Sequence, residues 1–147
     1  MRMFKSISKI CVGLFLTGAV AIGGSSAASA LNFQWTITNS FGSTLALDTA
    51  SCSPSGSISA PFTISSGNTV TFGGTSTSTS AICNVRYQDS ASHVYGCQFQ
   101  VQTDGTNGFI STNAYKGAHG GPTCTVVGNP NGTPIAGGWS GAFKMAQ

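Results

Sequence analysis

The residues best suited to hold a ligand lie in the second half of the chain. Tyr115, Lys116 and His119 fall in the glycine-rich segment NAYKGAHGGP (113–122), and Trp139 follows in the last segment. Aromatic and hydrogen-bonding side chains on a glycine-rich loop are a common way to hold sugars or lipid headgroups at the end of a β-sandwich. These four residues are the predicted ligand-binding site. The alternative is that Tyr115 only covers the edge of the core.

Hydrolysis is the alternative chemistry, and few titratable groups are available for it. The only side-chain carboxylates are Asp48, Asp89 and Asp104. The last two lie in turn sequences, where aspartate commonly caps the backbone. Glycoside hydrolysis normally needs paired carboxylates, and no G-x-S-x-G nucleophile motif is present. A non-enzymatic binding protein is favoured over a hydrolase in which His119 or His93 works with an aspartate.

Four cysteines follow the N-terminal region: Cys52, Cys83, Cys97 and Cys124. An even number in a small exported domain predicts two disulfides, which can pair in three ways. A bridge directly across a hairpin strains disulfide geometry, so we favour Cys52–Cys83 with Cys97–Cys124. No C-x-x-C, H-x-H or HExxH spacing occurs, and no metal or other cofactor is predicted.

The N-terminus has the three parts of a secretory signal peptide. The basic start MRMFKSISK is followed by an apolar run (10–22) that is too short to span a bilayer comfortably, and then by small residues ending in ASA (28–30). The alternative is a retained membrane anchor. We predict cleavage after Ala30, export to the medium or periplasm, and one mature domain, 31–147.

Cleavage would change the charge balance. The mature chain would keep three basic side chains against three acidic ones, and its net charge would be zero with both histidines neutral. No basic patch of the kind that attracts nucleic acid is present, so nucleic-acid binding is not expected. The basic residues that remain are Arg86, Lys116 and Lys144.

The clearest structural signal is the segment ICNVRYQDSASHVYGCQFQVQ (82–102). Apolar and polar residues alternate on both sides of DSAS (89–92), which predicts two antiparallel strands joined by a turn. A row of glutamines, from Gln98 to Gln102, would form the polar face. Each strand carries one cysteine on its apolar face.

The rest of the chain predicts further short strands separated by turns. Pro61 suits the edge of a sheet better than its middle. Together with the hairpin these make eight or nine strands, which is typical of an antiparallel sandwich or barrel. The other predicted strands are 32–38 (with Trp35 as core), 43–49, 58–64, 69–72, one starting at 109–110, 123–127 and 137–147, and the predicted loops are 51–56, 73–80, 113–122 and 129–134.

The front half of the domain resembles small secreted sandwich proteins of the aegerolysin type. The resemblance rests on ITNSFGSTL (37–45), SSGNTVTF (65–72) and NVRYQ (84–88), each a short strand with or next to a turn. It implies a sandwich that binds membrane lipid and sometimes works with a pore former. The chain differs from that pattern in its four cysteines and its glycine-rich second half.

Together these observations predict an all-β, antiparallel, immunoglobulin-like or aegerolysin-like β-sandwich linked by disulfides. We expect it to recognise a glycan or membrane lipid at a cell surface or envelope. A structural role at the envelope is the further alternative. Self-association through an edge strand is expected, because an unpaired strand edge can pair with another copy.

The export prediction can be checked directly. N-terminal sequencing of protein recovered from the medium or periplasm should give LNFQW, because cleavage after Ala30 leaves Leu31 first. Intact MRMFK in the membrane fraction would instead support the retained anchor.

Overall fold

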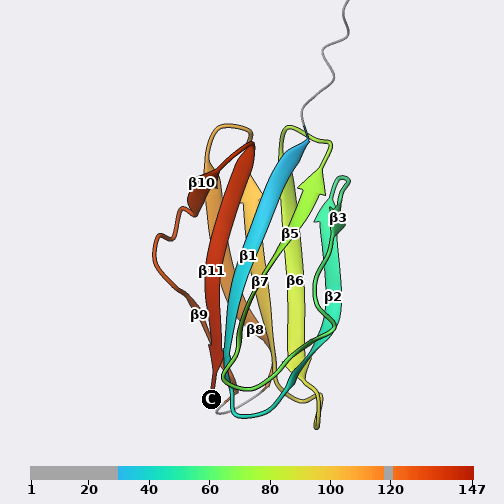
Figure 1. Cartoon of the computed structure of the whole chain (residues 1–147), viewed down its shortest axis with the longest axis vertical. Helices are drawn as coiled ribbons and strands as arrows, with labels where there is room; N and C mark the ends of the chain where they lie inside the picture. Colours follow the sequence, from blue (N-terminus) through green and yellow to red (C-terminus); the bar gives the residue numbers. More distant parts are fainter. Residues whose placement is uncertain (1–29, 118–120) are drawn as a thin grey trace, which may run out of the picture.

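The computed structural model describes residues 30–117 and 121–147, so residues 1–29 of the predicted signal peptide and His119 lie outside the described residues. The described part of the chain forms eleven strands and no helix (Figure 1), and hence no helix that could cross a membrane. The strands are β1 (Leu31–Ser40), β2 (Leu45–Ser53), β3 (Ser57–Ile58), β4 (Thr63–Ile64), β5 (Thr69–Ser76), β6 (Ala81–Asp89), β7 (Gly96–Thr103), β8 (Gly108–Lys116), β9 (Thr123–Val126), β10 (Thr133–Ile135) and β11 (Gly138–Ala146).

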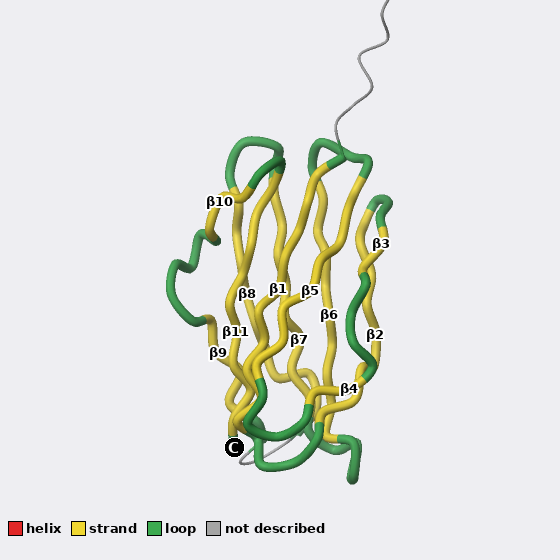
Figure 2. Tube along the Cα trace, in the orientation of Figure 1, coloured by secondary structure: helices red, strands yellow, loops and turns green. Residues whose placement is uncertain are grey.

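The strands form two sheets packed face to face. One sheet has the order β10-β11-β1-β5-β3, with β9 also paired to β11, and the other has the order β4-β2-β6-β7-β8. In Figure 1, β1, β5 and β11 lie in front of β6, β7 and β8, and Figure 2 shows the loops gathered at the two ends. The predicted β-sandwich is confirmed.

One strand pair departs from the predicted antiparallel arrangement. β1 and β11 run parallel, from Asn32 opposite Gly138 to Ser40 opposite Ala146. Parallel neighbours need a long connection between them, and here almost the whole domain separates the first strand from the last. The last strand therefore closes the sheet beside the first one without a hairpin.

Several predicted boundaries were wrong, and polar strand residues are the common reason. β2 extends to Ser53 and β5 to Ser76, into the predicted loops 51–56 and 73–80, while β10 begins inside the predicted loop 129–134. The predicted strand 58–64 is split at Pro61 into β3 and β4, which pair in different sheets. This split and β10 raise the strand number above the predicted eight or nine.

The largest correction concerns the predicted loop 113–122. β8 continues through its first four residues to Lys116 and pairs with β7 along its whole length. Its residues Ser111 to Asn113 are polar and give no apolar alternation, so the sequence pattern hid the strand. The pairing with β7, rather than intrinsic propensity, extends it.

The core lies between the sheets and is built from the alternate residues that each strand points inward. Trp35 is fully buried, as predicted, and stacks on Phe72 with ring centroids 5.7 Å apart. Phe99 and Phe143 meet across the two sheets at 5.3 Å. Aromatic pairs at such distances add to the stability gained from burying their area.

Both disulfides have the favoured pairing. Cys97 in β7 is bridged to Cys124 in β9, which joins the two sheets, while Cys52 and Cys83 link β2 to β6 within one sheet. The argument against a cross-strand bridge was too general, because Cys52 and Cys83 are themselves directly opposite, with Cα atoms 4.1 Å apart. Cys83 and Cys97 are not opposite each other in the β6–β7 register.

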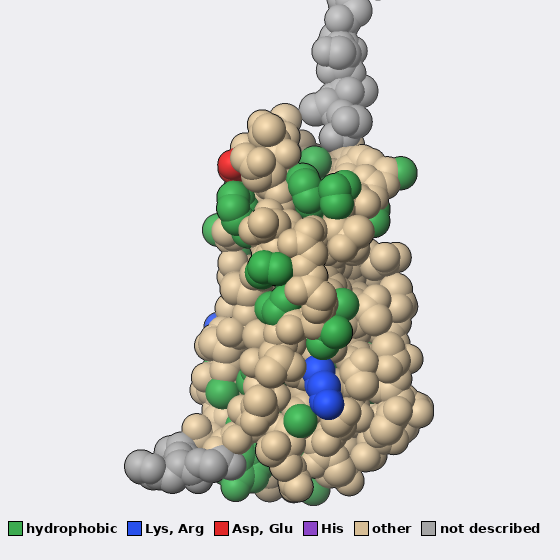
Figure 3. Space-filling model, turned by 90° about the vertical axis from the view of Figure 1, so that its left-hand side faces the viewer, with side chains coloured by type: hydrophobic (Ala, Val, Ile, Leu, Met, Phe, Trp, Pro, Cys, Tyr) green, Lys and Arg blue, Asp and Glu red, His purple; other side chains and the backbone are tan. Residues whose placement is uncertain are grey.

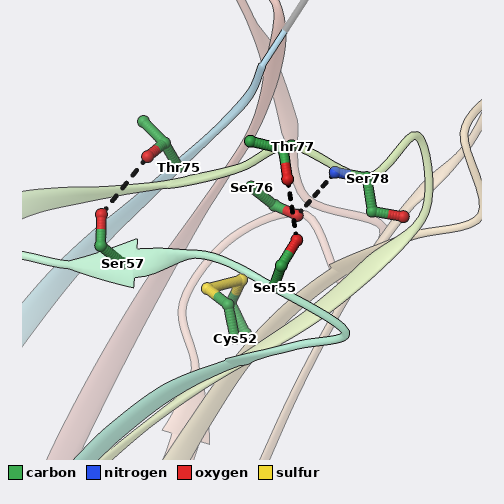
Figure 4. The surroundings of a disulfide bond; sticks show 8 residues. Cys52, Ser55, Ser57, Thr75, Ser76, Thr77 and Ser78 are labelled. Atoms are coloured by element: carbon green, nitrogen blue, oxygen red, sulfur yellow. Dashed lines mark hydrogen bonds between the residues drawn. A yellow bond between two sulfur atoms is a disulfide. The ribbon is translucent and has the colours of Figure 1, made fainter. Parts of the chain in front are cut away.

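A crowded turn covers the Cys52–Cys83 bridge (Figure 4). The hydroxyl groups of Ser55 and Thr77 form a hydrogen bond of 2.9 Å across this turn. Gly56 has a φ of +152°, and a Cβ atom there would lie 2.8 Å from the Cβ of Cys52 and 2.3 Å from the carbonyl oxygen of Thr75. Only glycine satisfies both the backbone angle and the available space.

Substitution of Gly56 should therefore cost more than substitution of an uncrowded glycine. Gly67 also has a positive φ, +80°, but open space around its Cα, so Gly67→Ala should cost about 1–2 kcal/mol of unfolding free energy. Gly56→Ala should cost at least about 1 kcal/mol more, because overpacking is added. Urea unfolding of the two variants tests this, and equal losses would contradict it.

Candidate functional site

The structure separates the predicted ligand-binding residues into two places. Tyr115 and Lys116 lie at the end of β8, and Trp139 packs on Gly108 at its beginning. Tyr115 comes seven residues after Gly108 along the strand, which corresponds to roughly 23 Å at about 3.3 Å per residue. His119 lies outside the described residues. Tyr115 and Trp139 therefore do not share one concave site.

Trp139 lines a hollow at one end of the sandwich, which we call the end hollow. Its volume is about 350 Å³. In the space-filling view of the edge that carries β9 and β10, hydrophobic side chains gather near the upper end, among polar ones (Figure 3). The residues lining the hollow are Asn107, Gly108, Phe109, Asn129, Asn131, Gly132, Pro134 and Trp139.

A glycine sets the position of the Trp139 indole. A Cβ atom on Gly108 would lie 2.2 Å from Cδ2 of Trp139, so the ring rests directly on the backbone of β8. Within its own sheet, Trp139 is opposite Pro134 of the neighbouring strand β10. Trp139 is thus half-buried, and Phe109, which is 40% exposed, lines the same hollow.

The three asparagines of the end hollow are all exposed, and the side chains of two of them also hold the loops. Asn129 donates to the Gly132 carbonyl at 2.9 Å and accepts from the Asn131 backbone at 3.0 Å. The amide nitrogen of Asn107 donates to Asp104 at 3.2 Å. The Asn131 side chain is exposed, so its amide is available to a ligand.

The second place is the outer face of the five-stranded sheet. Here the Tyr115 hydroxyl donates to Asp48 at 2.9 Å, although three strand spacings separate β8 from β2. The ring can lie across the sheet because Gly96 has no side chain, and a Cβ atom there would be 2.7 Å from the ring. Burial and the hydrogen bond to the Asp48 carboxylate raise the pKa of the Tyr115 phenol.

Two cations surround this ring. The Arg86 guanidinium carbon lies 5.1 Å and the Lys116 ammonium 5.5 Å from its centroid, within the usual cation–π distance. Arg86 donates to the Gln98 side chain at 2.8 Å, and Lys116 donates to the Gln88 side chain. We call Asp48, Arg86, Gln88, Tyr115 and Lys116 the outer-face cluster.

The residues suggested for the hydrolase alternative lie in turns. Asp89 is buried and accepts from the Ser43 hydroxyl at 2.6 Å, from the Ser92 hydroxyl and from two backbone N–H groups. The hydrogen bonds from Ser43 and Ser92 hold the pKa of the Asp89 carboxyl well below its usual range. His93 is exposed, with a φ of 57°, and its backbone N–H donates to the Asp89 carbonyl.

Asp104 has a similar place in the next turn. Its carboxylate accepts the backbone N–H groups of Asn107 and Thr106, at 2.7 and 2.8 Å, and these bonds lower the pKa of the Asp104 carboxyl. Both carboxylates thus cap the backbone, as their turn sequences indicated. Among the described residues, no group of three or more His, Cys, Asp or Glu side chains is placed to hold a metal ion.

Sequence reasoning missed Phe109, Asn131 and Arg86. Phe109 was placed in a short strand without a role, although it follows directly after an Asn-Gly turn, a position that brings a strand residue near the end of a sheet. Arg86 occupies a polar position in the alternation of the central hairpin. That pattern placed Arg86 on the outer face. Its proximity to Tyr115 could not be inferred without knowing the order of the strands in the sheet.

The sequence matches no model of a protein family, and a comparison with curated proteins also gives no match. Among solved structures, IP-1A from Alcaligenes faecalis is similar, with a TM-score of 0.53 and 15% sequence identity. The likeness covers 82% of this chain and 94% of that protein. At this identity the likeness is one of fold, so the described part of the chain is similar to IP-1A in architecture.

Proposed function

We propose that this protein is an exported, non-enzymatic binding protein that takes a sugar ring of a glycan into the end hollow. The observation that supports this most is that Trp139 and Phe109, two partly exposed aromatic residues, line one hollow together with three asparagines. The C–H face of a sugar packs on an aromatic ring, and its hydroxyl groups pair with amides. Ligand sites commonly combine apolar walls with a few placed polar groups in this way.

The size and the polar rim of the hollow favour a glycan over a membrane lipid. Its volume of about 350 Å³ is at the small end of the range for ligand sites. This space suits one or two sugar rings, whereas an acyl chain needs a longer apolar groove. Asn107, Asn129 and Asn131 line the hollow and would be costly to cover with hydrocarbon unless their amides kept hydrogen bonds.

Export is the second part of the proposal. The two disulfides indicate an oxidising compartment, extracellular or periplasmic. β1 begins at Leu31, so cleavage after Ala30 would release the sandwich with its first strand complete. A glycan outside the cell, at a surface or envelope, is then the ligand that such a protein would meet.

Trp139→Ala should weaken glycan binding roughly 10- to 100-fold while the fold persists, because loss of an aromatic contact costs about 1–3 kcal/mol. The measurement is an array of plant, fungal, bacterial and animal glycans, followed by calorimetry with the best-bound glycan. Gly108→Ala should weaken binding in the same way without removing the ring, because a Cβ atom there would displace the indole.

Phe62→Ala is the matched control, since Phe62 is 85% exposed and does not line the end hollow. Its affinity should equal that of the unchanged protein. Equal affinity in Trp139→Ala and the unchanged protein would refute this site. Absence of binding to every glycan on the array would refute the proposed function.

A further inference from the structure

The outer-face cluster places two cations near one aromatic ring, and in the part of the chain that the structure describes neither forms an ion pair with a carboxylate. Arg86 and Lys116 come from β6 and β8, and both approach the same Tyr115 ring, within 5.5 Å of its centroid. Their recorded hydrogen-bond acceptors are the neutral amide oxygens of Gln98 and Gln88. Two like charges near each other repel, and neutral amides offset this repulsion less than a carboxylate would.

The chain has three side-chain carboxylates, and each has other partners. Asp89 and Asp104 are held in their own turns by hydroxyl and backbone N–H groups. Asp48 belongs to the cluster, where it accepts from the Tyr115 hydroxyl. This carboxylate is therefore held at the phenol oxygen, whereas the two cations lie near the Tyr115 ring.

We propose that Arg86 and Lys116 bind an oxyanion, the carboxylate, sulfate or phosphate group of a ligand, on the outer face of the five-stranded sheet. This site is distinct from the end hollow, and the inference does not rest on the proposed function. The proposal rests on the observation that two half-buried cations approach the same aromatic ring.

The donors needed for an oxyanion are present. Nε of Arg86 is used by Gln98, which leaves the two terminal nitrogens of the guanidinium for a bidentate contact. The Lys116 ammonium has three N–H groups and gives one to Gln88. Arg86, Tyr115 and Lys116 are each only half-buried, so the two cations and the ring are partly exposed to solvent.

Lys144 provides an internal comparison. It is also a lysine on a strand, but it is exposed on β11, in the other sheet, beside Thr38 and Thr125 in the strand register. Its removal changes the net charge of the protein by the same amount as removal of Lys116. A difference between the two substitutions therefore reports the site and not the overall charge.

The test is a titration of the ¹⁵N-labelled mature chain, followed by NMR at constant ionic strength, with sodium sulfate, sodium phosphate and sodium glucuronate in separate arms. At least one anion should shift the amide signals of residues 86–88, 96–98 and 115–116 in a saturable way, and the strongest arm identifies the oxyanion. Arg86→Gln and Lys116→Gln should each weaken its binding tenfold or more, and Lys144→Gln should leave the affinity unchanged.

Gly96→Ala is the second variant, because it changes no charge but would push the Tyr115 ring away from its place. It should weaken binding while the protein stays folded, as circular dichroism and the unshifted amide signals of the other sheet would show. The inference is overturned if none of the three anions gives saturable shifts at these residues. It is also overturned if Lys144→Gln weakens binding as much as Lys116→Gln does.

Discussion

The packing of the β6–β7 hairpin against the other sheet is the contact on which the rest of the structure depends. Its inward residues, including Val85, Tyr87 and Phe99, are fully buried, and both disulfides start from this inward row. Its outward residues include Arg86. Since successive side chains point to opposite faces, a slip by one residue would place Arg86 in the core and the cysteines in solvent. Fold, bridges and the outer-face cluster thus share one register.

Glycines within strands explain how both candidate sites are formed. Gly108 supports the Trp139 indole and Gly96 supports the Tyr115 ring, in each case because a Cβ atom would overlap the ring. Glycine inside a strand normally weakens it. Here the lost side chains leave room for a large ring from another strand to rest against the backbone of the five-stranded sheet, where each ring stays half-buried.

The fold could be predicted because alternation and cysteine number are local signals. The hairpin, the core position of Trp35 and the presence of two disulfides follow from them, whereas the pairing of the cysteines does not. The sites could not be predicted to the same depth, because they depend on which strands are neighbours. Tyr115 lies 67 residues from Asp48 in sequence yet bonds to it, and no spacing pattern indicates such a contact. The extension of β8 from residue 113 to Lys116 was missed for the related reason that its pairing, not its composition, forms it.

The position of β8 at the edge of its sheet limits what a partner can do there. The backbone N–H of Ile110 donates to the Pro130 carbonyl at 3.2 Å, so the loop between β9 and β10 already covers the edge beside the end hollow. An added strand from a second copy would have to pair with the half of β8 nearer Lys116 or displace that loop. Because Tyr115 and Lys116 belong to that half, self-association along β8 would bring a second copy next to the outer-face cluster, so an edge pairing and the proposed anion site would be expected to influence each other.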